Sequence, residues 1–398
     1  MRIKSTLYSS IWVLTLISML AIQSCQSDAR NSTRIPPVVK KSKAQWEKDA
    51  LLSLSDLISR SIDLDVNYFK RARIYFDQEQ YKPALEDINE AIDEQENVGE
   101  YFLLRGKIKR ELGDLDQALE DAERAEALQQ GSPELYVLLA DILQAKGRFR
   151  EAGRYLSHAM KLAPYDASAY YVKGMLEARQ GDSLASLASL DYAMANNPRM
   201  LRAYLQSTVI NRKLNNIPQA LAVNNRAIKR FSNIPELYFE RAEIYNALAK
   251  PDTAVLYYQM AVKVNPNYTE AILKMANLEL YRGHYYPALL AFQQLQKVNP
   301  KYPQINNLVG FCYEKLGDYT QARAYYTVSL NMNADDRAAH NGMWRMRRNE
   351  TAGTQFGQEE NGDDEFRALD TARVKINMIQ PRKTINMQVD SSRKVKIQ

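Results

Sequence analysis

The feature that most constrains this chain is a 34-residue unit, which occurs eight times in succession from 65 to 336 without an inserted or deleted residue. Small side chains recur at fixed positions of the unit, one column lying twelve residues before another. Small residues on two successive helices let the helix axes approach closely, so that ridges of one helix fit grooves of the next. The pattern therefore predicts an antiparallel helix pair in every unit. The later column is Ala84, Ala118, Ala152, Ser186, Ala220, Ala254, Ala288 and Ala322; the earlier one is Ala72, Gly106, Ala140, Gly174, Thr208, Ala242, Ala276 and Gly310.

Glycine and proline mark the expected helix ends. Five units have glycine where the first helix should end, and glycine adopts the left-handed conformation of such a turn without steric cost. Four have proline after the second helix, where proline cannot continue a helix. An aromatic residue also recurs near the start of the first helix in six units. These residues are Gly113, Gly147, Gly181, Gly283 and Gly317; Pro164, Pro198, Pro266 and Pro300; and Tyr68, Phe102, Tyr136, Tyr170, Tyr204 and Tyr238.

This combination of period, small columns and aromatic column resembles the tetratricopeptide repeat, over about two-thirds of the chain. The resemblance implies an all-α, right-handed superhelical solenoid of helix-turn-helix repeats, in which each repeat packs only on its neighbours. It also implies that the first helices line an inner wall, and that such walls bind extended peptides or partner helices.

The fifth unit departs most from the pattern. Asn211 and Asn224 stand where several other units have large apolar residues, and Asn215 replaces the turn glycine. We interpret this unit as a weaker junction in the array, and a hinge is one form that such a junction could take.

The first 25 residues have the features of a secretory signal. Arg2 and Lys4 precede an apolar run from 11 to 22, which is too short to span a hydrocarbon core of about 30 Å. The segment ends in a sequence that resembles a bacterial lipoprotein box, with Cys25 as the residue that would carry the lipid. The alternative is a signal peptide that is cleaved near a chance cysteine. The residues after Cys25 predict, by resemblance to envelope sorting, anchoring to the outer membrane with the array facing the periplasm.

These features divide the chain into six segments. A repeat array needs polar outer faces at its ends, so the helices that flank it are interpreted as caps. The C-terminal one is expected to carry Met343, Trp344 and Met346 on one side and Arg345, Arg347 and Arg348 on the other. The segments are a signal peptide (1–25), a tether (26–43), an N-terminal capping helix (44–64), eight repeats (65–336), a C-terminal capping helix (337–349) and a tail (350–398).

The tail is acidic in its first part and basic from 372 to 398. The acidic part has too few apolar residues to order itself by burial. In the basic part apolar residues alternate with polar ones, which is a strand signal. Such a segment could add a strand to the sheet of a partner, and the alternatives are a disordered or a self-paired tail. The docking residues of this hypothesis are Val374, Ile376, Met378, Ile385, Met387 and Val389.

The sequence lacks the motifs of common active sites. It has no glycine-rich phosphate loop, no HExxH and no paired CxxC, so we expect no enzyme activity, metal or cofactor. The three histidines lie in different repeats. Acidic residues such as Glu86, Asp87 and Glu90 are expected to face solvent, and Cys312 is expected to be a small buried thiol.

The candidate site is the inner wall. By position in the repeat, its residues are Phe69, Lys70, Arg73, Phe76, Lys107, Arg110, Tyr171, Met175, Arg179, Val209 and Arg212. The basic start of this wall predicts attraction of acidic peptides or of a terminal carboxylate, because guanidinium groups match carboxylates. The lysine and asparagine of the family's carboxylate clamp are not reproduced, since Phe69 and Arg73 stand at those positions. A solvated groove without specific recognition is the alternative. The acidic part of the tail could also fold back on Arg73, Lys107 and Arg110 as a plug.

The function that these features favour is a non-enzymatic, lipid-anchored scaffold, which joins envelope proteins during outer-membrane protein assembly, secretion or motility, or as an adaptor of wall enzymes. Its partners would be proteins or peptides, and not nucleic acid. The alternative is an outer-membrane lipoprotein that binds glycans or nutrients. Glycan-binding lipoproteins that resemble this family interrupt the array with long loops. The array of this chain is uninterrupted, which counts against the alternative.

Overall fold

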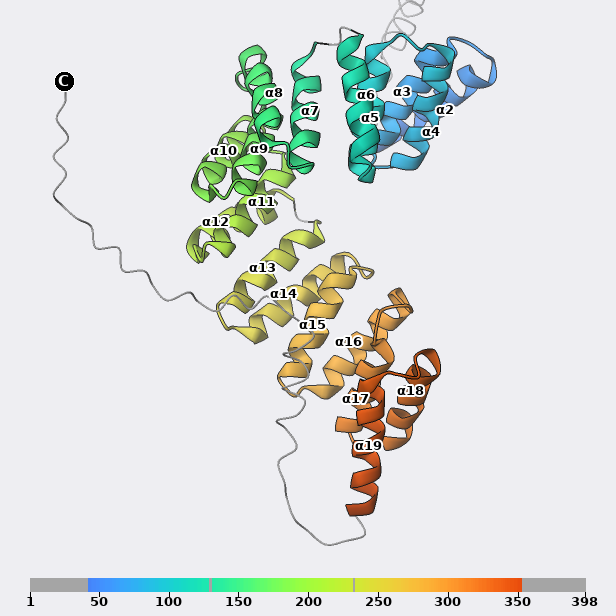
Figure 1. Cartoon of the computed structure of the whole chain (residues 1–398), viewed down its shortest axis with the longest axis vertical. Helices are drawn as coiled ribbons and strands as arrows, with labels where there is room; N and C mark the ends of the chain where they lie inside the picture. The colour runs from blue at the N-terminus through green and yellow to red at the C-terminus, as the bar shows by residue number, and fades with distance from the viewer. Residues whose placement is uncertain (1–41, 129–130, 232, 353–398) are drawn as a thin grey trace, which may run out of the picture. The chain divides into compact units, whose positions relative to one another are not determined.

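The computed structural model describes residues 42–128, 131–231 and 233–352, which form eighteen α-helices and no β-strand (Figure 1). They divide into two compact units between Ala247 and Leu248. Among the described helices, none is long and apolar enough to cross a membrane. Unit 1 contains α2 (Lys43–Ser59), α3 (Leu64–Asp77), α4 (Tyr81–Glu94), α5 (Gly99–Leu112), α6 (Leu115–Ala127), α7 (Pro133–Ala145), α8 (Phe149–Leu162), α9 (Ala167–Arg179), α10 (Ser183–Asn196), α11 (Leu201–Lys213), α12 (Ile217–Arg230) and α13 (Pro235–Ala247). Unit 2 contains α14 (Pro251–Val264), α15 (Thr269–Tyr281), α16 (Tyr285–Val298), α17 (Ile305–Lys315), α18 (Tyr319–Met332) and α19 (Arg337–Ala352).

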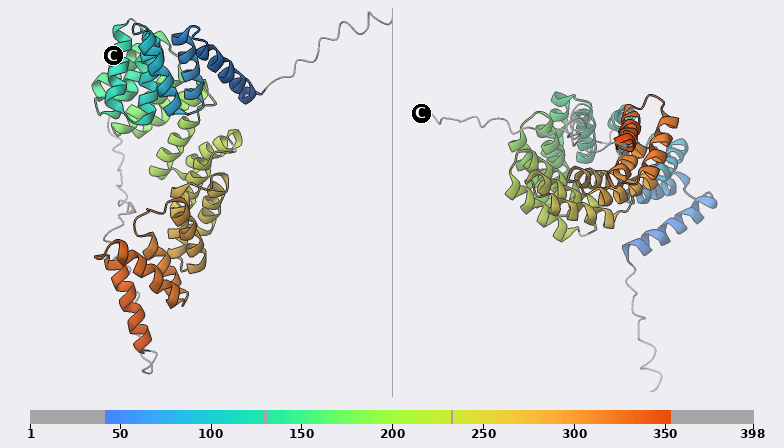
Figure 2. Two further views of the ribbon diagram at one scale, coloured as in Figure 1. Left: turned by 90° about the vertical axis from the view of Figure 1, so that its right-hand side faces the viewer. Right: turned by 90° about the horizontal axis from the view of Figure 1, so that it is seen from below.

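The helix boundaries confirm the period. Within each unit consecutive helices pack against one another, as the two further views in Figure 2 also show. The second helices of successive repeats begin 34 residues apart, at Tyr81, Leu115, Phe149, Ser183, Ile217, Pro251, Tyr285 and Tyr319.

The small columns lie where helices approach most closely. All eight residues of the column that starts at Ala84 are completely buried. A Cβ added to Gly174 would lie 3.1 Å from the backbone oxygen of Ser186 and 3.0 Å from Cγ of Leu190. A larger side chain at this position would therefore push the two helices of the repeat apart, which is why the column stays small.

The turns between paired helices use the left-handed conformation that the glycines predict. Gly113, directly after α5, has a φ of 88°. In the fifth repeat Asn215 takes the same role with a φ of 58°. Asparagine tolerates this conformation better than most residues, so the fifth repeat keeps the turn without glycine.

The fifth repeat contains buried amides that are hydrogen-bonded. The Nδ2 of Asn211 donates to the backbone oxygen of Ser207 at 2.9 Å, and the Nδ2 of Asn224 donates to the backbone oxygen of Leu237 at 2.9 Å. The Nε of Arg241 donates to Oδ1 of Asn224 at 2.8 Å. Buried amides with partners do not carry the large cost of unpaired polar groups. The boundary between the compact units also lies in the following repeat, after Ala247, and not in the fifth.

The last helix packs differently from the expectation. Met346 is 1% exposed whereas Trp344 is 57% exposed, and the guanidinium of Arg345 donates to the buried Glu314 at 2.7 and 2.8 Å. The prediction that Trp344 shares a side with Met346 is wrong, because residues two apart on a helix point about 200° apart. Gly342 allows this docking, since a Cβ there would overlap the ring of Tyr326.

Candidate functional site

The residues proposed for the inner wall lie on the first helices of the repeats of unit 1: α3, α5, α9 and α11. We call this set of eleven residues, from Phe69 to Arg212, the wall of unit 1. Side chains of α3, α5 and α11 reach the following first helix through the aromatic and ion-paired contacts that follow.

The aromatic residues at the start of the wall are packed against neighbours. The ring centroids of Phe69 and Tyr101 are 4.9 Å apart, and those of Phe76 and Tyr81 are 5.9 Å apart. The hydroxyl of Tyr101 donates to Oδ2 of Asp65 at 2.9 Å. Burial, together with the hydrogen bond to this carboxylate, raises the pKa of Tyr101 to about 12. Phe69 is thus part of the packing between the first and second repeats, Phe76 packs within the first repeat, and both are only half exposed.

Three cations at the start of the wall have acidic partners on the next first helix. Lys107 pairs with Glu134 on α7, and Nε of Arg110 lies 2.7 Å from Oδ2 of Asp141 on the same helix. Arg73 lies more loosely, 3.9 Å from Glu100. The start of the wall is thus basic with carboxylates of the following repeat beside these three cations, and its attraction of acidic peptides stays a prediction.

The same arrangement recurs at the far end of the wall. The Nη2 of Arg212 on α11 lies 3.0 Å from Oε2 of Glu240, and its Nη1 lies 3.7 Å from Glu243, both on α13. Lys70 and Arg179 are exposed. Four of the six cations of the wall therefore lie beside carboxylates, so a segment with a long run of negative charge meets these carboxylates as well as the cations.

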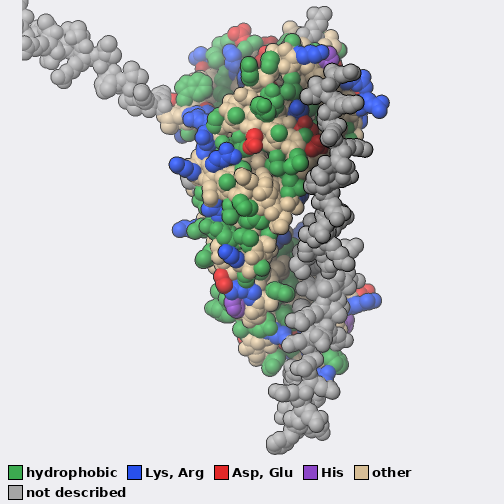
Figure 3. All heavy atoms as spheres, turned by 90° about the vertical axis from the view of Figure 1, so that its left-hand side faces the viewer, with side chains coloured by type: hydrophobic (Ala, Val, Ile, Leu, Met, Phe, Trp, Pro, Cys, Tyr) green, Lys and Arg blue, Asp and Glu red, His purple; other side chains and the backbone are tan. Residues whose placement is uncertain are grey.

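The middle of the wall is its partly exposed apolar section. Tyr171 and Met175 on α9 and Val209 on α11 are each half-buried. Burial raises the pKa of Tyr171 above its ordinary value, so its hydroxyl stays protonated at neutral pH. Exposed apolar side chains also occur elsewhere, including Leu184 at 76% and Tyr165 at 81%, and hydrophobic side chains reach the surface on the face drawn in Figure 3. Exposure alone therefore does not single out the wall.

Sequence reasoning missed one contact. The guanidinium of Arg202, in the first turn of α11, donates from Nη1 and Nη2 to the two carboxylate oxygens of Glu111, in the last turn of α5, at 2.9 and 2.8 Å. The two residues are 91 positions apart and belong to the fifth and the second repeats. The sequence did contain a signal. Glu111 lies at the negative C-terminal end of its helix and Arg202 at the positive N-terminal end of its helix, so each charge is unfavourable in its own helix.

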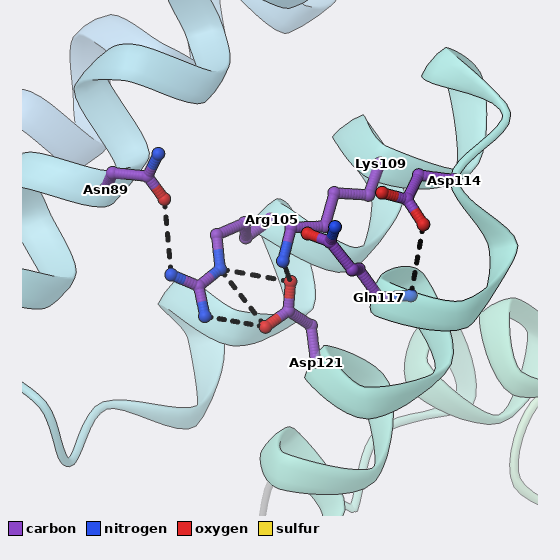
Figure 4. A network of polar contacts seen from close by, with 6 residues as sticks. All are labelled: Asn89, Arg105, Lys109, Asp114, Gln117 and Asp121. Atoms are coloured by element: carbon purple, nitrogen blue, oxygen red, sulfur yellow. Dashed lines mark hydrogen bonds and ion pairs between the residues drawn. The ribbon is translucent and has the colours of Figure 1, made fainter.

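A second polar network is structural. Asp121 is buried and accepts from Arg105 at 2.7 to 3.1 Å and from Lys109 at 2.7 Å, while Arg105 also reaches Asn89 of the preceding repeat (Figure 4). Such a network lies between helices and offers no open face to a ligand. In the same figure the carboxylate of Asp114 accepts from the backbone of Gln117 and caps α6.

The first repeat has the same kind of pair. Arg71 donates to the buried Asp87 at 2.6 and 2.7 Å. The prediction that Asp87 faces solvent is wrong: the helix spacing places it toward α3, and Arg71 neutralises it there. Arg71 also donates to Ser55 of α2 at 3.0 Å, as Arg105 does to Asn89, so α2 holds the place of a preceding second helix.

Among the described residues, few other side chains that could bind a metal or take part in chemistry lie together. In the described part of the chain, no cluster of three or more His, Cys, Asp or Glu side chains is placed to hold a metal ion. His284 contacts Glu279, with Nδ1 2.7 Å from Oε2. Cys312 is buried, as the sequence predicts, and burial raises the pKa of its thiol to about 12. Cys25 and the tail docking residues lie outside the described residues, as does the acidic segment of the plug hypothesis.

Family comparisons agree with the repeat pattern. Models described as tetratricopeptide repeat match residues 69–133, 109–176, 235–268 and 273–339, which together make up more than half of the chain. The unmatched stretch 177–234 contains the fifth repeat, whose amides depart from the pattern. No curated protein matches the chain.

Several solved structures are similar to part of this chain. The C-terminal part of a TPR repeat-containing protein from Cytophaga hutchinsonii is 16% identical, with a TM-score of 0.49, over 60% of this chain and 98% of that one. A tetratricopeptide repeat protein from Parabacteroides merdae is 17% identical, with a TM-score of 0.45, over 66% and 99%. PilF of Pseudomonas aeruginosa is 15% identical, with a TM-score of 0.43, over 54% and 97%. At these identities the similarity concerns the fold alone.

Proposed function

Because this chain belongs to the tetratricopeptide repeat family, we propose that it is a non-enzymatic scaffold, which holds polypeptide partners against the wall of unit 1. Arrays of stacked helix pairs present extended surfaces, and these surfaces are what repeat proteins use for binding. The proposal places the partner on the first helices and leaves the second helices to hold the array together.

The observation that carries this proposal is the apolar section formed by Tyr171, Met175 and Val209 between two ion-paired sections of the wall. Protein interfaces commonly combine a central apolar group with a polar rim. Arg110 with Asp141 and Arg212 with Glu240 supply such a rim on either side. A partner segment would place apolar side chains at the centre and satisfy its backbone polar groups against the rim.

We propose further that the scaffold is anchored by a lipid on Cys25 to the outer membrane and faces the periplasm, where it joins proteins of an envelope assembly. The box that ends in Cys25 supports this part of the proposal, and so does the polar segment 26–43, which would serve as a tether. The basic part of the tail would supply a second docking segment through its alternating apolar residues.

Affinity purification from membranes tests the partner proposal. The chain with Met175→Glu and Val209→Glu should lose the proteins that co-purify with the unmodified chain, because two buried carboxylates in a contact surface are costly to desolvate. Leu184→Glu is the matched control, since it introduces the same charge at an apolar position that is 76% exposed outside the wall. If the double variant retains every protein that the control retains, the wall is not the binding surface.

Membrane fractionation tests the anchor. Cys25→Ser should move the chain from the membrane fraction to the soluble fraction without changing its helix content. Retention of the variant in the outer-membrane fraction would exclude Cys25 as the anchor.

A further inference from the structure

The bridge between Arg202 and Glu111 is the contact that the fold of the individual repeats does not explain. The other ion pairs of the wall join neighbouring repeats, with 27 to 31 residues between the partners. This pair joins residues that are 91 positions apart, from the end of α5 to the start of α11. It therefore brings the end of α5 to the start of α11, although five helices lie between them in the sequence.

Local electrostatics disfavours both members of the pair. Glu111 is an anion in the last turn of α5, where the carbonyl end of the helix is already negative. Arg202 is a cation in the first turn of α11, where the amide end is already positive. Each charge is thus unfavourable for its own helix, and what compensates it is the charge on the other helix.

The surroundings of the pair belong to the wall. Tyr171, from the apolar section, lies within electrostatic reach of Arg202, Glu111, Arg110 and Asp141. Tyr81, at the start of α4, is influenced by Arg202 and Glu111. The charges of the bridge therefore act on the hydroxyl of Tyr171, which belongs to the apolar section.

Arg202 and Glu111 differ in their exposure to solvent. The side chain of Arg202 is 59% exposed and that of Glu111 is 23% exposed. A guanidinium binds carboxylates through two parallel hydrogen bonds, and Glu111 uses this geometry in full. Because the guanidinium of Arg202 is exposed, a second carboxylate can reach it, and an acid that takes over both hydrogen bonds would replace Glu111 without leaving Arg202 unpaired.

We propose that Arg202 is the carboxylate-binding residue of the wall and that Glu111 occupies it as an internal competitor. A partner segment then binds by placing one of its own Asp or Glu side chains on Arg202, while its apolar side chains cover Tyr171 and Met175. The bridge opens in the same step. This inference rests on the proposed function, and it specifies the ligand: an extended segment with an isolated acid among apolar residues, and not an acidic run.

A binding measurement with designed peptides tests the inference on the full chain, purified in detergent. The probe is a fluorescent peptide with a single Glu among Ala and Leu residues, and its control has Gln in place of that Glu. In Glu111→Gln the competitor loses its charge, so the Glu peptide should bind about threefold to fivefold more tightly, as expected for loss of one exposed ion pair. The affinity for the Gln peptide should stay the same.

The reciprocal variants complete the test. Arg202→Gln should abolish the preference for Glu over Gln. The double variant Glu111→Arg with Arg202→Glu keeps a bridge but inverts it, so it should prefer a peptide with Lys at the same position. An equal gain for both peptides in Glu111→Gln would mean that the bridge is only a steric barrier and would overturn the assignment of Arg202, as would an unchanged Glu preference in Arg202→Gln.

Failure of this inference is separable from failure of the proposed function. If Met175→Glu with Val209→Glu loses its co-purifying proteins while Arg202→Gln keeps them, the wall binds partners without a carboxylate on Arg202. If both variants keep them, the wall itself is the wrong surface.

Discussion

The second and the fifth repeats of unit 1 have the same fold but different buried polar chemistry. In the second, the carboxylate of Asp121 is held between helices by Arg105 and Lys109. In the fifth, the buried polar groups are the amides of Asn211 and Asn224, which bond mainly to backbone oxygens and to neutral side chains. The comparison teaches that the repeat accommodates either a buried ion pair or buried amides when these groups are hydrogen-bonded.

The largest expected effect comes from removing the anion of the second repeat. Asp121→Ala leaves two cations without their carboxylate between packed helices, so the free energy of unfolding of unit 1 should fall by about 3 to 5 kcal/mol. Denaturant unfolding measures this. Asp116→Ala is the control on the same helix, because the side chain of Asp116 is 89% exposed; it should cost less than about 1 kcal/mol. Equal losses in the two variants would contradict the structural role of the network.

The corresponding change in the fifth repeat should be smaller. Asn224→Leu makes this repeat more like its neighbours in sequence, but it removes the acceptor of Arg241 and the donor to the Leu237 oxygen. We expect a loss of about 1 to 3 kcal/mol, from the two hydrogen bonds of the buried amide that the variant removes. Hydrogen exchange of α12 and α13 would locate it. Stabilisation by this variant would show that the amide is only tolerated and not used.

A pH dependence should distinguish the two repeats at alkaline pH. Tyr101 belongs to the second repeat, and the fifth has Ala203 at the equivalent position. The folded-state pKa of Tyr101 is about 12, above the ordinary value of 10. The unfolded chain therefore loses this proton first, so the stability contributed by Tyr101 is complete below pH 10 and is lost as pH rises toward 12.

At about pH 11 the contribution of Tyr101 should have fallen by about 1 kcal/mol. Tyr101→Phe should remove this loss, so the stability of the variant should fall less with rising pH than that of the wild type. Denaturation midpoints at a series of pH values measure the difference. Tyr204→Phe, on a tyrosine of the fifth repeat, serves as the comparison. The same slope in wild type and Tyr101→Phe would rule out the contribution.

The smallest effect concerns the turns. Asn215→Gly should stabilise the fifth repeat by about 0.5 kcal/mol, because glycine adopts a positive φ at lower cost than asparagine. The reverse change, Gly113→Asn in the second repeat, should destabilise by a similar amount. Thermal unfolding of both variants would measure the pair. A loss of stability in Asn215→Gly would mean that the side chain of Asn215 contributes more than its backbone conformation.

Much of the fold follows from local patterns, and part of the wall does not. The helix pairs, the glycine turns and the buried thiol of Cys312 were predictable, because each depends on residues close in sequence or on a column repeated many times. The pairing of Lys107 with Glu134 was not, since the positional argument considered one helix at a time. Asp87 was misplaced for a related reason: a long cation on the neighbouring helix can neutralise an acid that spacing alone assigns to solvent.

The sequence by itself determined the stacking of helices, because close approach needs small residues and those residues recur every 34 positions. Only the tertiary structure decided that Glu111 meets Arg202, across 91 residues and several intervening helices. The reason is geometrical. Each repeat adds a small rotation to the next, and the sum of those rotations, which no single repeat encodes, sets which distant side chains come within hydrogen-bond distance.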